Sequence, residues 1–171
     1  LTAAFGAHGF LLGPKSHHVT IRRCRAFCNR SAGIHVTGND HAIENNEVFR
    51  NNTYGIQLRY AITRARVAGN LCYHNGPNNG ETTDTSLPTD LGLYGQGDYV
   101  VFENNIVDGL HQNAFRTKTG HGINVTTVVR GNVVRGFFDS SGGRCLENNT
   151  ILSNGLGSRF GFYPMRVNPR Y

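Results

Sequence analysis

Residues 43–51, IENNEVFRN, carry a motif that recurs without gaps along most of the chain. Equivalent nine-residue segments begin at Ile21, Val67, Phe102, Val129 and Leu146. Their fourth positions are residues 24, 46, 70, 105, 132 and 149, so the motif returns about every 22 residues, with one longer interval. A repeat of this length indicates one structural unit that buries its apolar face by stacking on its neighbours.

The third and fourth residues of the motif have different roles. The third residue is Asn or Gly in every copy but the first, and these residues best tolerate the left-handed αL conformation. The third residues are Arg23, Asn45, Gly69, Asn104, Gly131 and Asn148. We expect a bend there, followed by an inward Asn that hydrogen-bonds the equivalent Asn of the next repeat. Cys24 replaces the Asn in the first copy and is expected to end this ladder.

Further columns follow in the same register. A second Asn column contains Asn29, Asn51, Asn75 and Asn154, and is interrupted by Leu110 and Phe137. One inward apolar column is expected to contain Phe10, Ile34, Ile56, Leu93, Phe115 and Phe137, and another Ile21, Ile43, Val67, Phe102, Val129 and Leu146. Together these columns predict an all-β, right-handed parallel β-helix. We expect a single solenoid domain over residues 1–171, of about six to seven coils, with a loop insertion at 77–90.

Charged residues alternate in sign between neighbouring repeats. Arg22 falls over Glu44 and Arg25 over Glu47. A further outward column contains Glu103, Arg130 and Glu147. Adjacent strands lie about 4.8 Å apart, so ion pairs on the outer surface are expected. We therefore assign these four glutamates a structural role.

The composition is consistent with β structure and restricts the partners. The net charge is +6 and the pI about 9.5, but Lys and Arg are spread along the chain. A nucleic-acid partner is therefore not favoured, and an acidic polysaccharide accounts for the charge equally well. No apolar run is long enough to span a membrane. Free thiols are expected at Cys24, Cys28, Cys72 and Cys145, which show no CxxC spacing.

The pairing of GIQL at residues 55–58 with ENN at 44–46 and 103–105 resembles the right-handed parallel β-helix repeat proteins, the pectate-lyase-like superfamily. The resemblance covers nearly the whole chain. It implies a fold that hosts lyases, hydrolases, epimerases, tail proteins and adhesins, commonly with polysaccharide bound along one strand face. We expect an extracellular or periplasmic location.

The first strand of each repeat offers a candidate groove, because its outward positions alternate with buried ones. One outward column is expected to contain Leu11, His35, Gln57, Tyr94, Arg116 and Phe138, and the neighbouring one Gly13, Thr37, Arg59, Gln96, Lys118 and Ser140. Polar, aromatic and cationic residues gather in the middle repeats. The candidate substrate-binding residues are His35, Gln57, Tyr94 and Gln96.

The leading hypothesis is a polysaccharide lyase, or a related epimerase, that acts on a uronate-containing polymer. Removal of the proton next to a carboxylate requires a base, and cations that neutralise the developing charge. Lys118 is the candidate base, with Arg116 and Arg59 as the cations. Residues 116–122, RTKTGHG, resemble the lysine-bearing strand of the chondroitinase B and alginate lyase family. The family's Arg one coil later would fall at Ser140, where this sequence departs from the pattern.

Two alternatives stay open. An inverting glycoside hydrolase would use Asp40 and Asp98, two coils apart and so separated by about 9.6 Å, with His121 assisting. The GHG at 120–122 is similar to one in the polygalacturonase family, although that family's NTD, DD and RIK signatures are missing. The other alternative is a non-catalytic carbohydrate-binding or structural β-helix, such as a surface or tail protein.

Cofactors and metals are not expected from the sequence. Adjacent His17 and His18 would point in opposite directions on a strand, and no HxH or HxxxH pair occurs. Calcium is a minor alternative at Glu81, Asp84 and Asp90, whose spacing matches no calcium loop. No helix precedes the first repeat, so a fragment, or an end-capping partner or oligomer, is a further expectation.

Overall fold

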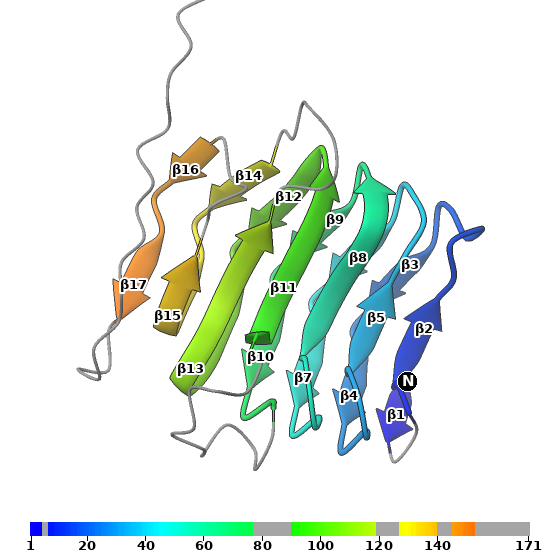
Figure 1. Cartoon of the computed structure of the whole chain (residues 1–171), viewed down its shortest axis with the longest axis horizontal. Coiled ribbons are helices and arrows are strands. Elements are labelled where there is room, and N and C mark those ends of the chain that lie inside the picture. The colour runs from blue at the N-terminus through cyan, green and yellow to red at the C-terminus, as the bar shows by residue number, and fades with distance from the viewer. Residues whose placement is uncertain (5–6, 77–89, 119–126, 140–144, 153–171) are drawn as a thin grey trace, which may run out of the picture.

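The structure is a computed structural model, which describes residues 1–4, 7–76, 90–118, 127–139 and 145–152. These residues form short strands and no helix. Each strand pairs in parallel with strands one repeat away, so the chain winds into coils stacked along one axis (Figure 1). The all-β parallel β-helix predicted from the repeats is therefore confirmed.

Each coil contributes strands to three faces. The first face contains β1 (Thr2–Ala4), β4 (Arg25–Phe27), β7 (Glu47–Phe49), β10 (Leu71–Tyr73), β17 (Thr150–Leu152) and the first parts of β13 (Ile106–Lys118) and β15 (Val133–Asp139). The second face contains β2 (Phe10–Leu12), β5 (Ile34–Val36), β8 (Ile56–Thr63), β11 (Asp90–Asp98) and the later parts of β13 and β15. The third face contains β3 (Thr20–Arg22), β6 (Ala42–Glu44), β9 (Arg66–Ala68), β12 (Val100–Glu103), β14 (Thr127–Arg130) and β16 (Cys145–Glu147).

The bend from the third face to the first contains the predicted asparagine ladder. Its αL residues are the predicted ones, Arg23, Asn45, Gly69, Asn104, Gly131 and Asn148, with φ between 50° and 63°. The side-chain amide of Asn70 donates to the Oδ1 of Asn105 at 3.0 Å and to the backbone oxygen of Ile43 at 2.8 Å. The same amide-to-amide bond joins Asn46, Asn105 and Asn132 to the asparagine of the following coil. Cys24 ends the ladder, because it contributes only a backbone N–H, to Asn46.

A second ladder lines the corner between the first and second faces. Asn29 donates to Asn51 at 2.8 Å, and Asn51 donates to Asn75 at 2.9 Å. Each follows an αL residue, and these are Cys28, Arg50 and His74. Where Leu110 and Phe137 interrupt the column, β13 and β15 continue around the corner without a break. The missing asparagines thus change the local structure from a tight bend to a curved strand.

The interior contains the predicted apolar columns. On the third face, strand pairing aligns Ile21, Ile43, Val67, Phe102, Val129 and Leu146. On the second face a Gly precedes the inward residue, because backbones of adjacent coils approach closely. A Cβ at Gly55 would lie 2.5 Å from the backbone oxygen of Gly92 and 2.8 Å from the Nδ2 of Asn75. Only Gly fits there without a shift of the neighbouring coil.

The prediction was wrong by one residue at Phe137 and Phe138. Phe138, expected outside, is 7% exposed and stacks on Phe115 in the core, with ring centroids 5.1 Å apart. The pairing of β13 with β15 is irregular between Asn113 and Phe115, so Phe115 pairs with Phe138. As a result Asp139, and not Phe138, lies beside Arg116.

The charge columns form ion pairs on the outer surface, and the predicted pairs are confirmed in part. Arg22 lies beside Glu44 in the strand register, but among the described residues Glu44 binds Arg66 and not Arg22. Arg25 binds Glu47 at 2.7 Å. On the third face, Ala68 lies between Glu44 and Glu103 in the strand register, and Arg66 contributes a guanidinium that binds both carboxylates. These glutamates are therefore occupied by arginines within the scaffold.

Replacing Asn70 with Ala should lower the free energy of unfolding by about 3 kcal/mol, because each buried polar group left unpaired costs about 1–3 kcal/mol. Asn46 would lose its acceptor, and Ile43 its donor. Urea unfolding followed by circular dichroism measures the loss. The matched control is Asn104→Gly at the αL position, which Gly occupies in two coils, with an expected change under about 1 kcal/mol. Equal losses in the two variants would contradict the ladder.

The decrease of the free energy of unfolding at acid pH should depend on the carboxylate of Glu103. Its side chain is 7% exposed, and hydrogen bonds from Arg130 and then Arg66 hold the pKa of its carboxyl below the ordinary value. A carboxylate with a lowered pKa stabilises the fold above its unfolded pKa, about 4.3, and that contribution is lost as the pH falls through the folded pKa. The variant Glu103→Gln should therefore show a flatter loss of unfolding free energy below about pH 5. Glu147→Gln, at an exposed position, is the control. A wild-type acid slope in Glu103→Gln would refute this role.

Candidate functional site

The second face carries an outward row of polar and aromatic side chains across its middle coils. Strand pairing places His35 of β5 beside Gln57 of β8, Gln57 beside Tyr94 of β11, and Tyr94 beside Arg116 of β13. The predicted column is confirmed over these four residues. We call His35, Gln57, Tyr94 and Arg116, with Arg59 and Tyr54 beside them, the polar strip.

Gln57 occupies the centre of the polar strip. It points outward, because its neighbours Ile56 and Leu58 are fully buried in the core, yet only 3% of Gln57 is exposed. Its Nε2 has no hydrogen-bond partner within the part of the chain that the structure describes. A buried amide donor without a partner costs about 1–3 kcal/mol of stability. Among the described residues, Gln57 therefore keeps an unused donor at its Nε2, while its side chain also shares a hydrogen bond with His35.

Two histidines flank Gln57 on its amino-terminal side. The rings of His8 and His35 lie 4.8 Å apart, centroid to centroid. Burial lowers the pKa of His35, the charges of His8 and Arg59 lower it further, and a hydrogen bond with Gln57 opposes them. Burial also lowers the pKa of His8. The Nδ1 atoms of both rings are buried and have no hydrogen-bond partner among the described residues. Neutral imidazoles can both donate and accept, so this end of the strip suits hydroxyl groups.

Arg59 is held over two tyrosines on the other side. Its guanidinium carbon lies 5.9 Å from the ring centroid of Tyr54 and 5.8 Å from that of Tyr94. The two rings are 5.8 Å apart. Cation–π contacts of this kind hold an arginine in place. Sequence reasoning did not identify Tyr54, because it lies in the turn before β8 and belongs to no repeating column.

The strand register places two further predicted residues beside the strip. Gln96 of β11 pairs with Lys118 of β13, two residues beyond Arg116. The side chains of Gln96 and Lys118 are not among those that the structure describes. His121 lies outside the described residues altogether, as do residues 77–89, most of the predicted loop insertion. The roles of Lys118, Gln96 and His121 stay predictions.

The two aspartates of the hydrolase alternative lie at the corner between the second and third faces. Asp40 accepts two hydrogen bonds from Arg64, at 2.6 and 2.8 Å, which hold the pKa of its carboxyl below the ordinary value. A general acid requires the opposite shift. Asp98 pairs with Thr63, so it belongs to the column next to that of Asp40. This geometry favours a structural role for Asp40 over an acid–base pair with Asp98.

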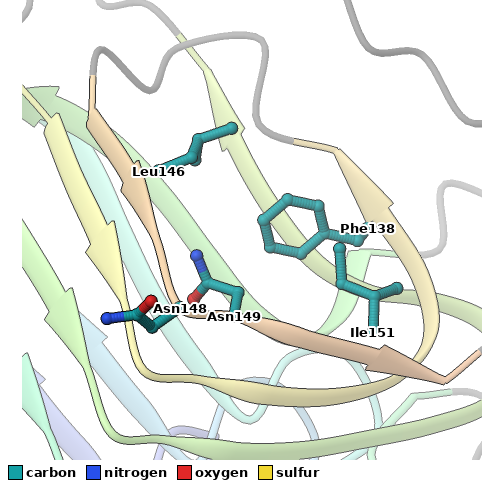
Figure 2. A pocket seen from close by; sticks show the side chains of 5 residues that line it. All are labelled: Phe138, Leu146, Asn148, Asn149 and Ile151. Atoms are coloured by element: carbon teal, nitrogen blue, oxygen red, sulfur yellow. The ribbon is translucent and has the colours of Figure 1, made fainter.

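A separate hollow of about 220 Å³ lies at the end of the coil stack (Figure 2). It is lined by Phe138, Leu146, Asn148, Asn149 and Ile151. Phe138, Leu146 and Ile151 belong to the apolar core, Asn149 is the last described ladder residue, and Asn148 is the exposed αL residue before it, so the hollow is lined by residues of the scaffold.

The described residues contain no cluster of three or more His, Cys, Asp or Glu side chains able to hold a metal ion. Cys24, Cys28, Cys72 and Cys145 are free thiols, as predicted. Among the described residues, no helix is long and apolar enough to cross a membrane.

Comparison with protein families assigns the fold independently. Residues 8–163 match the model described as the right handed beta helix region. Comparisons with curated proteins and with solved structures found no match. The match covers most of the chain and agrees with the coils, ladders and parallel faces described above. The chain belongs to the right-handed β-helix family.

Proposed function

We propose that this chain binds a carboxylate-bearing polysaccharide along the polar strip of its second face. The observation that carries the proposal is the outward but buried Gln57, whose Nε2 has no partner among the described residues. A polar group kept unpaired at the cost of stability is characteristic of a binding site. A sugar hydroxyl within reach of Gln57 and His35 would accept a hydrogen bond from the Nε2 of Gln57 and donate one to His35.

Arg59 and Arg116 indicate that the ligand is acidic. Guanidinium groups bind carboxylates through two parallel N–H donors, which gives both strength and orientation. Arg59 is already ordered against Tyr54 and Tyr94, so little side-chain entropy is lost on binding. Successive coils present His35, Gln57, Tyr94 and Arg116 about every 4.8 Å along the axis. A linear polymer lying parallel to that axis therefore meets hydroxyl-binding groups at His35 and Gln57, with Arg59 on the same strand as Gln57, and then Arg116 two strands farther on.

Gln57→Leu separates binding from stability. The variant removes both the unpaired Nε2 donor and the hydrogen bond between Gln57 and His35, so the two effects offset and the free energy of unfolding should change by less than about 1 kcal/mol. Binding of polygalacturonate or alginate, measured by calorimetry, should weaken by about fivefold or more through loss of one hydrogen bond. Thr53→Val, at a half-exposed position in the preceding turn, is the control. Unchanged polyuronate binding by Gln57→Leu would show that the strip is not the binding site.

For turnover, we propose β-elimination at a uronate residue. Lys118 would take the proton next to the carboxylate, while Arg59 and Arg116 neutralise the charge that develops on the carboxylate oxygens. The electron pair of the broken C–H bond forms the new C=C bond, and the glycosidic oxygen departs as the leaving group. The position of Lys118 supports its assignment as the base. Lys118 and Arg116 are on one strand, and Lys118 pairs with Gln96 beside the polar strip. An epimerase would use the same proton removal and return the proton to the opposite side.

A screen of acidic and neutral polysaccharides tests this chemistry, with ultraviolet absorbance and reducing ends recorded together. Elimination creates an absorbing unsaturated uronate and a reducing end, so both signals should appear with polyuronates only. The variant Lys118→Ala should lose at least about a hundredfold in rate while it keeps polyuronate binding. Reducing ends without absorbance would point to the hydrolase. Binding with neither signal would exclude the lyase and the hydrolase, and exchange of solvent deuterium into the polymer would then separate an epimerase from a non-catalytic carbohydrate-binding β-helix.

A further inference from the structure

The corner between the second and third faces brings together two histidines that sequence reasoning had separated. His17 and His18 were expected to point in opposite directions, as neighbours on a strand do. That prediction was wrong, because His18 adopts the αL conformation, with φ of 57°, and the chain bends there. The Nδ1 atoms of the two rings lie 2.9 Å apart, and both side chains are exposed.

The corner position of the pair is fixed by the next coil. His17 forms a parallel β-bridge with Asn39, and the backbone N–H of His18 donates to the Asn39 oxygen at 3.2 Å. The two rings meet edge to face, with centroids 5.1 Å apart and planes at 89°. Adjacent backbone positions on a rigid scaffold therefore hold both imidazoles at one point of the surface.

The two Nδ1 atoms are close enough to reach one metal ion. Two nitrogen ligands about 2.05 Å from one ion are about 2.9 Å apart at a right angle and about 3.3 Å apart at the tetrahedral angle. The observed Nδ1 separation of 2.9 Å is the length of the hydrogen bond that joins the two rings, and it is similar to both of these spacings. The preference among ions follows from the order in which nitrogen sites bind divalent metals, in which Cu²⁺ binds most tightly.

We propose that His17 and His18 form a two-histidine chelate for a divalent transition-metal ion, with Cu²⁺ bound most tightly. In the metal-free protein the two Nδ1 atoms share one hydrogen bond. On binding, both rings adopt the Nε2–H tautomer and turn their Nδ1 lone pairs toward the ion. Exposed side chains make that rotation at little cost. Water completes the coordination, since no third His, Cys, Asp or Glu joins them among the described residues.

The negative charge of a neighbouring carboxylate, that of Asp40, favours a bound cation at this site. Asp40 occupies the αL position one coil after His18. The pKa of its carboxyl is lowered chiefly by Arg64, with smaller contributions from His18 and His41. Its two oxygens already accept hydrogen bonds from Arg64, so Asp40 is not counted as a ligand.

Titration of the whole chain with Cu²⁺, Ni²⁺ and Zn²⁺ tests the proposal. Calorimetry should give one site per chain, with affinity falling from Cu²⁺ to Ni²⁺ and Zn²⁺. Pulsed electron paramagnetic resonance of the Cu²⁺ form should show two imidazole nitrogens. His17→Ala and His18→Ala should each weaken Cu²⁺ binding by about tenfold or more, because the chelate is lost.

The matched control is His74→Ala. His74 is also an αL residue at a corner, but its ring packs on Tyr73, with centroids 5.3 Å apart. This variant should bind Cu²⁺ as the wild type does. Wild-type affinity in His17→Ala or His18→Ala, or a spectrum with a single imidazole nitrogen, would overturn the proposal. Circular dichroism of each variant verifies that the coils are intact.

Discussion

Each inward asparagine of the β-helix can satisfy its amide only if the next coil presents the same residue at the same height. Asn70 illustrates this constraint, since its Nδ2 donates to Asn105 in the next coil and to the backbone of Ile43 in the preceding one. A slip of one residue would bury these groups unpaired, at about 1–3 kcal/mol for each group. The ladder therefore fixes the register between coils, and the register decides which side chains point outward. The polar strip exists at its present position because of bonds made inside the helix.

The parts of the fold that follow this repeated bend could be predicted from the sequence. The αL positions, the two ladders and the inward column from Ile21 to Leu146 all depend on local chemistry that recurs in each copy. Phe138 could not be placed, because the pairing irregularity near Asn113 shifts the register by one residue and leaves no mark in the pattern. Tyr54 and the His17–His18 pair were missed for a related reason. They lie in turns, where side-chain direction is set by individual φ values and not by strand alternation.

The residues that serve the scaffold and those available for binding differ in how well their polar atoms are satisfied. Glu103 and Asp40 are bound by arginines that neutralise them, which is what a structural carboxylate requires. Gln57 is more buried than Asp40, yet retains an amide donor without a partner among the described residues. This difference between paired carboxylates and an unpaired amide supports a function on the second face. The difference is seen in the surroundings of each polar group and cannot be read from the residue type alone.

The three corners of the coil differ in the side chains that occupy them. Two of them are occupied by asparagine ladders, which tolerate little variation because each amide needs an identical neighbour. The third corner has no such ladder, and its column contains His17, Asn39, Thr63 and Asp98. Thr63 donates to Asn39, but the Oδ1 of Asp98 is buried without a partner among the described residues. In the described coils only backbone hydrogen bonds repeat at this corner, from His18 to Asn39, Asp40 to Thr63 and Arg64 to Asp98, so its side chains are free to differ from coil to coil. It borders the second face, so chemical groups can vary beside the polar strip while the ladders elsewhere keep the coils in register.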